Sequence, residues 1–146
     1  MAELPLHDIV ELEQLLATYA VGMTRGDVEV VQGCFAPDGW YSAFGDVYEL
    51  PDYPRLIEAA PKGVFITGTP ELHLDTEAGT GTGMQTLLFV DQTNHAMRMG
   101  WYTDTYRRTE RGWRIATRSM TFLRRNGTRD AGRPHDPNRP EPTRKA

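Results

Sequence analysis

The feature that most constrains this fold is a change of hydrophobic period near residue 64. Before it, apolar residues recur at helical spacing, and after it apolar and polar residues alternate with a period of two. The alternating part divides into candidate strands at residues 64–75, 80–90, 96–109 and 113–124. Turn-forming segments containing Gly, Asp or Asn separate the strands. Helices followed by an antiparallel meander predict an α+β fold rather than a parallel sheet.

The N-terminal part predicts two helices. An apolar stripe at helical spacing covers residues 9–23, so this helix must pack against another element. Asp8 and Glu11 have the spacing of a capping box at its start. Gly26 is suited to the left-handed position that ends a helix, and Asp27 can cap a second helix.

Turn residues and prolines divide the segment between the helices and the meander. We expect a turn at residues 36–39, a strand at 40–44 and one short helix at 56–60, bounded by prolines. Residues 126–146 contain four prolines and show no periodicity. We therefore expect one domain over residues 1–125 and a Pro-rich basic C-terminal tail that is either flexible or lies on the acidic body, where it could cover the mouth of the cone. Removing residues 128–146 is expected to leave the fold intact.

Charge and composition exclude several classes of function. The chain has 146 residues, which suits one domain. Residues 1–122 carry 9 Lys/Arg and 17 Asp/Glu, and this acidic body argues against a nucleic-acid partner. No apolar run approaches the roughly 20 residues of a membrane span, and no signal peptide is recognisable. Cys34 is the only cysteine, which fits a reducing cytoplasm.

The common catalytic and cofactor motifs are missing. Gly79–Gly83 is rich in glycine, but no Lys-Ser/Thr follows it and it enters a strand, so it is not a phosphate loop. No Gly-x-Ser-x-Gly elbow occurs, and the four histidines lack metal-ligand spacing. We expect no metal and no cofactor, and we expect Cys34 to be a small core residue.

A series of short segments, in order, carries a resemblance to a known family. They are Tyr19, Phe35-Ala36-Pro37-Asp38, Gly100-Trp101-Tyr102-Thr103-Asp104 and Gly112-Trp113-Arg114-Ile115. On these segments the chain resembles the SnoaL-like branch of the nuclear-transport-factor-2-like superfamily, over about residues 6–123. The resemblance implies a cone-shaped α+β domain, with a curved antiparallel sheet wrapped around N-terminal helices and a small molecule inside.

The resemblance also implies a catalytic pair from which this sequence departs. Dehydratases and dehydrochlorinases of the family use a His–Asp dyad, in which the imidazole abstracts a proton and the carboxylate orients it. Thr24 or Met23 stands where the carboxylate would be, and Val64 or Phe65 stands where the imidazole would be. The usual dyad is therefore not expected here.

Asp104 and Arg118 are the remaining catalytic candidates. Strand alternation places Tyr102, Asp104 and Tyr106 on one face, and the resemblance turns Tyr102 toward the cavity. Arg118 corresponds to a pocket arginine of the family dehydrochlorinases and lies on the neighbouring strand. Two charges inside a poorly solvated cone should pair. The pair is either structural, or Asp104 acts as acid or base and Arg118 orients it.

The expected pocket is largely apolar and aromatic. Its predicted lining is Tyr19, Trp40, Phe65, Tyr102 and Met120, with Arg118. One of the adjacent polar residues Gln85 and Thr86 should also face inward and needs a partner.

We expect this pocket to hold a small hydrophobic molecule of polyketide, steroid or terpenoid type. The expected activity is a cofactor-independent isomerisation, dehydration or cyclisation by proton transfer. The alternatives are a non-catalytic binding or accessory module, and a scaffold like the β-subunits of ring-hydroxylating dioxygenases. Met97, Met99 and Trp101 alternate on one strand, so we expect self-association as a dimer or trimer through the outer face of the sheet.

Overall fold

The computed structural model describes residues 3–124 and 138–145. Within them the helices are α1 (Leu6–Arg25), α2 (Val28–Gly33) and α3 (Tyr53–Ala59). The strands are β1 (Phe35–Ala43), β2 (Asp46–Glu49), β3 (Gly63–Thr67), β4 (Glu71–Asp75), β5 (Thr80–Asp91), β6 (Met97–Thr109), β7 (Gly112–Leu123) and β8 (Arg144–Lys145). None of these helices is long and apolar enough to cross a membrane.

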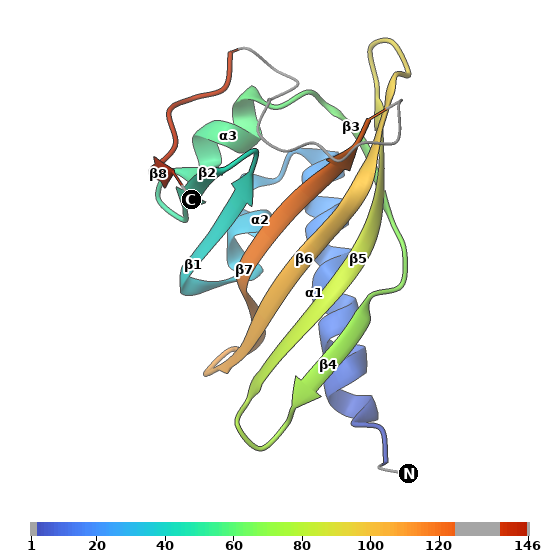
Figure 1. The fold of residues 1–146 in the computed structure, drawn as a ribbon, viewed down its shortest axis with the longest axis vertical. Coiled ribbons are helices and arrows are strands. Elements are labelled where there is room, and N and C mark those ends of the chain that lie inside the picture. The colour runs from blue at the N-terminus through green and yellow to red at the C-terminus, as the bar shows by residue number, and fades with distance from the viewer. Residues whose placement is uncertain (1–2, 125–137, 146) are drawn as a thin grey trace.

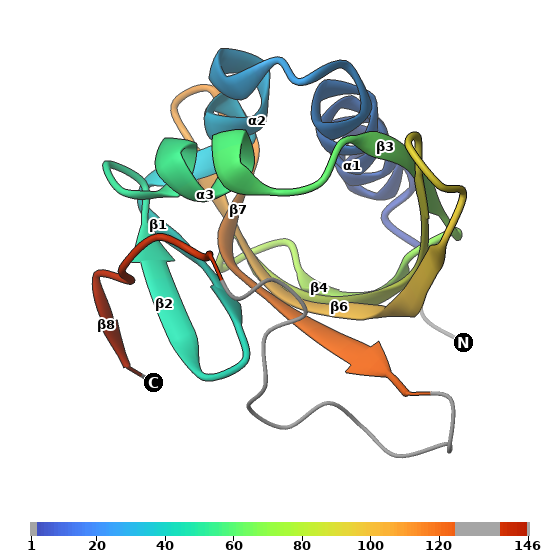
Figure 2. The same cartoon turned by 90° about the horizontal axis from the view of Figure 1, so that it is seen from above.

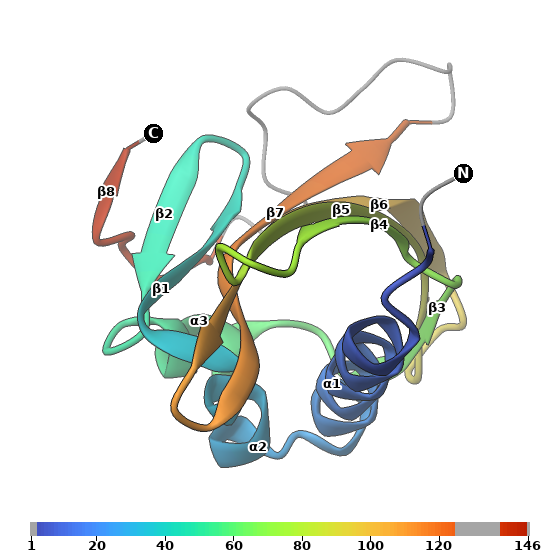
Figure 3. The same cartoon turned by 90° about the horizontal axis from the view of Figure 1, so that it is seen from below.

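The strands form one curved sheet that packs around the helices. Its order is β3-β5-β6-β7-β1-β2-β8, and β4 also pairs with β5. The long strands β5, β6 and β7 are antiparallel neighbours, whereas β1 joins β7 in parallel. Figure 1 shows these strands running side by side, and Figure 3 shows the sheet curving over α1. The predicted α+β architecture is confirmed.

The segment predicted as one strand at residues 64–75 forms two. β3 pairs with the end of β5, and β4 pairs with its beginning. The break falls at Gly68–Pro70, where Pro70 has no N–H to donate to a ladder. Gly68 spans the break: its N–H donates to the Thr86 carbonyl at 3.0 Å, and its own carbonyl accepts from Gln85 Nε2 at 3.0 Å.

The turn predicted at residues 36–39 is instead an irregular part of β1. The register against β7 advances from Phe35–Ile115 to Trp40–Thr117, so extra residues of β1 bulge out of the ladder. A Cβ at Gly39 would lie 3.0 Å from the Ala36 carbonyl oxygen, so a side chain there would be crowded. The turn residues are therefore accommodated as a bulge within the strand.

The predicted capping box has a different role. α1 begins at Leu6 without a side-chain cap. Asp8 accepts a hydrogen bond from Trp113 Nε1 at 2.8 Å, and Glu11 accepts one from the Trp113 backbone N–H at 2.6 Å. These carboxylates hold the start of α1 against the β6–β7 hairpin, because the two N–H groups of the buried Trp113 need acceptors.

The predicted helix boundary after α1 is confirmed. Gly26 follows α1 in the left-handed conformation, with φ of 70°. Asp27 caps α2 by accepting a hydrogen bond from the Val30 N–H at 3.3 Å.

The core lies between α1, α2 and the concave face of the sheet. Its fully buried members include Leu12, Leu16, Val31, Phe35 and Ile115. Cys34 is also buried there, as predicted. Burial raises the pKa of its thiol to about 11, so the sulfur stays protonated at neutral pH.

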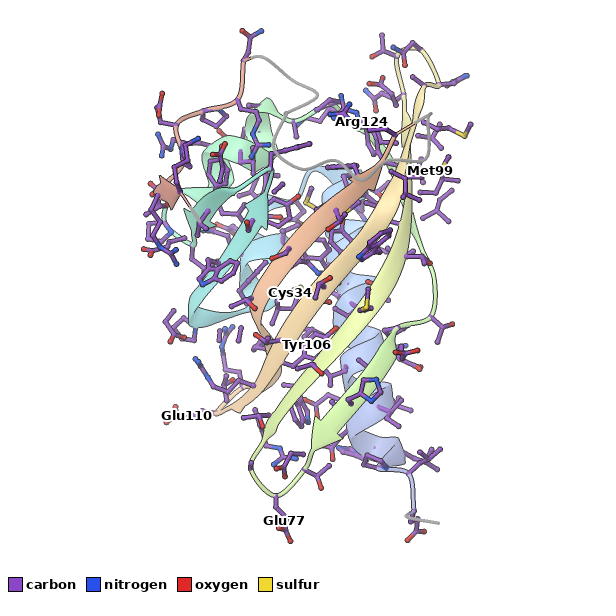
Figure 4. All side chains as sticks on the ribbon, viewed as in Figure 1. Cys34, Glu77, Met99, Tyr106, Glu110 and Arg124 are labelled. Atoms are coloured by element: carbon purple, nitrogen blue, oxygen red, sulfur yellow. The ribbon has the colours of Figure 1, made fainter. Side chains whose placement is uncertain are left out.

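The outer face of the sheet carries exposed methionines. Met97 is 62% exposed and Met99 is 45% exposed. Figure 4 shows Met99 near Arg124 at one end of the long strands, with Glu77 and Glu110 at the opposite end. The self-association predicted through this face stays a prediction.

Residues 138–145 pack on the body of the protein, which is the second of the two arrangements expected for the tail. β8 pairs antiparallel with β2, and the Tyr48 hydroxyl donates to the Pro140 carbonyl at 2.7 Å. Asp46 forms ion pairs with both Arg139 and Lys145. Proline does not prevent this packing, because Pro140 supplies a carbonyl and β8 begins after Pro142. Predicted tail residues 126–137 and 146 lie outside the described residues.

Candidate functional site

A cavity lies between the concave sheet face, α1 and α3. The centre of a water molecule can occupy about 110 Å³ of this cavity. By the same measure a single bound water needs only about 10–15 Å³, so the cavity has room for a larger molecule. Figure 2 views the surrounding elements from above, with α1, α3 and β3 on one side and β6 and β7 on the other. The polar side chains in its otherwise apolar lining are Tyr19, Tyr41, Tyr53, Tyr102, Arg98 and Arg139. The cavity has the apolar walls and few polar groups of a small-molecule site.

The predicted lining is only partly the observed one. Tyr19, Phe65, Tyr102 and Met120 line the cavity. Trp40 does not, because neighbouring residues of a strand point to opposite faces and Tyr41 takes the inward position. The Trp40 ring instead lies against Arg144 of β8, with 5.8 Å between the guanidinium carbon and the ring centroid.

Several lining residues were missed from the sequence. α3 contributes Tyr53, Leu56 and Ile57, and the tail contributes Arg139 and Pro140. Leu56 and Ile57 gave a signal for a helix, but nothing local indicates which surface that helix covers. The tail residues are charged or proline and carry no apolar period, so no pattern places them at a cavity.

Paired tyrosine hydroxyls dominate one wall. The hydroxyl oxygens of Tyr19 and Tyr53 lie 2.6 Å apart and form a buried hydrogen bond. Tyr41 stacks on Tyr53 with ring centroids 4.9 Å apart, and Tyr102 meets Tyr19 edge to face. Burial raises the pKa of Tyr19 and Tyr53 well above the ordinary value of a phenol. Both phenols are therefore neutral hydrogen-bond donors at physiological pH.

A buried polar network lies next to the tyrosines, and within the described residues only Nη1 of Arg118 lacks a hydrogen-bond partner in it. Arg118 Nε and Nη2 each donate to an Asp104 carboxylate oxygen at 2.8 Å, and Nη2 also donates to Gln85 Oε1 at 2.9 Å. The Tyr106 hydroxyl donates to Asp104 Oδ2 at 2.6 Å. The Arg118 guanidinium carbon lies 3.7 Å from the centroid of Tyr102, one of the lining residues. Gln85 is thus the inward member of the Gln85–Thr86 pair.

The predicted pairing of Asp104 with Arg118 is observed, with neither side chain exposed. Both carboxylate oxygens are occupied by protein donors, and neither residue lines the cavity. This geometry favours the structural interpretation of the pair. A catalytic role for Asp104 stays a prediction.

The positions that the resemblance assigns to the His–Asp dyad meet in space. The Phe65 backbone N–H donates to Thr24 Oγ1 at 3.0 Å, and Met23 and Phe65 both line the cavity. Neither a carboxylate nor an imidazole stands there. His73, on β4, is exposed and bonds Glu71 instead. The described residues contain no cluster of His, Cys, Asp and Glu suited to a metal.

Comparison with known proteins identifies relatives of this fold. The model of the SnoaL-like domain family matches residues 5–119. No curated protein sequence matches the chain. Rv3472 of Mycobacterium tuberculosis, a protein of unknown function solved as a point variant, is 24% identical, with a TM-score of 0.72. That match covers 85% of this chain and 79% of Rv3472.

Two further structures show the same fold at lower identity. An NTF2-like protein with a cystatin-like fold from Novosphingobium aromaticivorans is 20% identical, with a TM-score of 0.73 over 84% of this chain and 87% of that chain. A hexachlorocyclohexane dehydrochlorinase, LinA-type3 from Novosphingobium barchaimii, is 14% identical. Its TM-score is 0.72 over 90% of this chain and 96% of that chain.

Proposed function

Because the chain belongs to the SnoaL-like family, we propose that it binds one hydrophobic small molecule in its cavity and catalyses a proton transfer on it. The family and its structural neighbours include dehydratases and dehydrochlorinases, which supports a small-molecule enzyme. The proposed reaction is an isomerisation, dehydration or cyclisation that needs no cofactor. The proposed substrate is a carbonyl compound with an apolar ring system.

One observation carries the proposal, the hydrogen bond between the Tyr19 and Tyr53 hydroxyls on an apolar wall. One hydroxyl proton is used within the pair, so the other can be donated to an oxygen of the bound molecule. Such a donor, fixed in a largely apolar site, stabilises the negative charge that develops on a carbonyl oxygen when a neighbouring proton leaves. The phenols would therefore polarise the carbonyl group.

A specific observation favours a second function, non-catalytic binding. The residues that line the cavity include no His, Asp or Glu, so the cavity offers the oxygen a donor but offers the departing proton no ordinary base. With the Asp104 carboxylate fully bonded, the same pocket suits an accessory protein that carries or presents its ligand.

Deuterium exchange separates the two functions. β-Tetralone is an apolar ketone of suitable size, and its α-protons exchange in D₂O when the carbonyl is polarised. We expect the wild-type protein to accelerate this exchange, measured by proton NMR. Replacing both Tyr19 and Tyr53 with Phe should remove about 10²-fold or more of the acceleration, as for other lost charge-stabilising donors. Trp40→Phe, outside the cavity, is the matched aromatic control.

The outcomes point in different directions. Binding of β-tetralone without exchange would contradict catalysis and support the accessory function. Failure to bind any apolar ketone or phenol would contradict both.

A further inference from the structure

The cavity differs between its two ends. The end around Tyr19, Tyr53 and Tyr102 is buried. The other end is lined by half-buried residues, which we call the rim: Phe44, Arg98, Phe122, Arg139 and Pro140. Phe44 and Phe122 stack there with ring centroids 5.3 Å apart, and the Arg139 guanidinium carbon lies 4.9 Å from the Phe44 ring centroid.

The rim concentrates positive charge on an acidic protein. Arg98 and Arg139 both line the cavity, and none of the lining residues among 3–124 and 138–145 is acidic. The body of residues 1–122 is acidic, with 9 Lys/Arg and 17 Asp/Glu, so two arginines at one cavity are unusual in this protein. Guanidinium groups at a cavity suit a ligand that carries an acidic group.

Arg139 is held in place but only partly satisfied. Its side chain is 10% exposed, and Nη2 donates to the Ala43 carbonyl at 3.3 Å. Asp46, its acidic partner, lies 3.7 Å away and is shared with Lys145. Nε of Arg139 has no hydrogen-bond partner within the part of the chain that the structure describes. A guanidinium has five N–H donors in a planar fork, so this one retains donors for a ligand.

We propose that the rim binds a carboxylate on the ligand, so that the molecule held in the cone is an amphipathic organic acid. The planar fork of an arginine matches a carboxylate, and the stacked Phe44 and Phe122 rings suit the adjoining apolar skeleton. This inference rests on the proposed function of the cavity and adds the chemical class of its ligand.

The geometry also sets the length of the acid. Arg98 and Tyr102 both lie on β6 and both line the cavity. Four residues of a strand span about 13 Å, since each residue advances about 3.3 Å. A ligand with two or three fused rings and a polar group at each end is of this order of length. Its carboxylate and its reacting oxygen stand at opposite ends.

Matched naphthalene probes test this class directly. The acid probe is a hydroxynaphthoate with its hydroxyl and carboxylate at opposite ends of the fused rings. Its methyl ester has the same shape without the charge, and β-naphthol lacks the acid group. Dissociation constants come from calorimetry or from probe fluorescence at neutral pH. We expect the wild-type protein to bind the acid about tenfold or more tightly than the ester, because charge-assisted hydrogen bonds contribute this much.

Variants assign the preference to the rim. Arg139→Met should weaken binding of the acid about tenfold and leave β-naphthol within about twofold. Arg98→Met should act in the same direction. Arg144→Met is the matched control, because Arg144 belongs to the same tail but pairs with the surface residue Glu49 and does not line the cavity. Circular dichroism and thermal melting establish that each variant is folded.

Asp46→Asn provides a test with the opposite sign. This change removes the carboxylate that competes for Arg139, so binding of the acid should strengthen severalfold. If Asp46 and Arg139 only hold the tail, Asp46→Asn should instead weaken binding of every probe.

The outcomes distinguish this inference from the proposed function. Equal affinity of the wild type for acid and ester, with β-naphthol still bound in a Tyr19- and Tyr53-dependent manner, would overturn the carboxylate site alone. A parallel loss of all three probes in Arg139→Met would overturn it as well. Failure of the wild type to bind any probe would overturn both proposals.

Discussion

Arg118 and Arg139 are both guanidiniums packed on aromatic rings, yet their counter-charges lie at different distances. Arg118 is completely buried between two strands and makes hydrogen bonds with Asp104 and Gln85. Arg139 comes from the tail, keeps 10% of its side chain exposed and has its acidic partner at 3.7 Å. Each guanidinium keeps one buried nitrogen without a partner in the part of the chain that the structure describes, Nη1 of Arg118 and Nε of Arg139. The difference therefore lies in the counter-charge: a carboxylate bound through two hydrogen bonds ties Arg118 to the fold, whereas a more distant carboxylate leaves Arg139 able to bind a ligand.

The largest effect is expected from breaking the Arg118 network. Asp104→Asn leaves the Arg118 guanidinium buried without its counter-charge. Arg118→Met likewise leaves the Asp104 carboxylate buried without a cation. Each change should lower the free energy of unfolding by about 3–5 kcal/mol, measured by urea denaturation. Equal destabilisation with β-tetralone exchange retained would exclude Asp104 as the catalytic group. A loss below about 1 kcal/mol would contradict the structural interpretation of the pair.

Removing the tail should have an intermediate effect. A chain ending at Pro137 loses β8 and the hydrogen bond from Tyr48 to Pro140. We expect the melting temperature to fall by about 5 °C, corresponding to roughly 1–2 kcal/mol for a chain of this size. The hydroxynaphthoate should also lose its preference over the ester. An unchanged melting temperature would show that the tail contacts contribute nothing to stability.

Alkaline pH should lower the free energy of unfolding, because the buried tyrosines of the cavity wall cannot ionise in the folded protein as easily as in the unfolded chain. Burial raises the pKa of Tyr41 to about 12, and it raises those of Tyr19 and Tyr53 as well. The unfolded chain ionises near pH 10 and the folded chain does not, so stability should be constant below pH 10 and fall as the pH rises toward 12. Urea denaturation at a series of pH values measures this. Tyr41→Phe should make the decline shallower, and an identical decline would contradict the assignment.

The smallest effect is expected on the outer face. Met99→Gln changes an exposed side chain that does not line the cavity, so the free energy of unfolding should stay within about 0.5 kcal/mol. Probe affinities should not change. If the predicted self-association uses this face, sedimentation velocity should show a shift toward smaller species, whereas an unchanged oligomer would exclude Met99 from the contact.

The sequence predicted the parts of the molecule whose patterns are local. Alternation placed Tyr102, Asp104 and Tyr106 on one face of β6 and the family resemblance turned that face inward; all three residues are buried. The Asp104–Arg118 pair followed from two facing strands in an apolar interior. These predictions succeeded because one buried face fixes the register of a strand.

The failures arise where long-range contacts decide. The bulge in β1 shifts its register, so the inward residue is Tyr41 and not Trp40. The rim depends on Tyr48 and Pro140, 92 residues apart in sequence. No local period predicts such a contact, because only the folded chain brings the Pro140 carbonyl to the Tyr48 hydroxyl. Likewise, only the folded sheet shows that residues 64–75 divide between the two ends of β5.

The attachment of α1 through Glu11 to Trp113 has a kinetic consequence. The two residues that share this hydrogen bond are 102 positions apart. Contacts at such separation raise the contact order, and a high contact order slows folding because loop closure must come before the contact is gained. The apolar stripe of α1 can form helix early, but its start is anchored only after the β6–β7 hairpin exists. Substitutions at Asp8 and Glu11 should therefore speed unfolding and leave the refolding rate nearly unchanged.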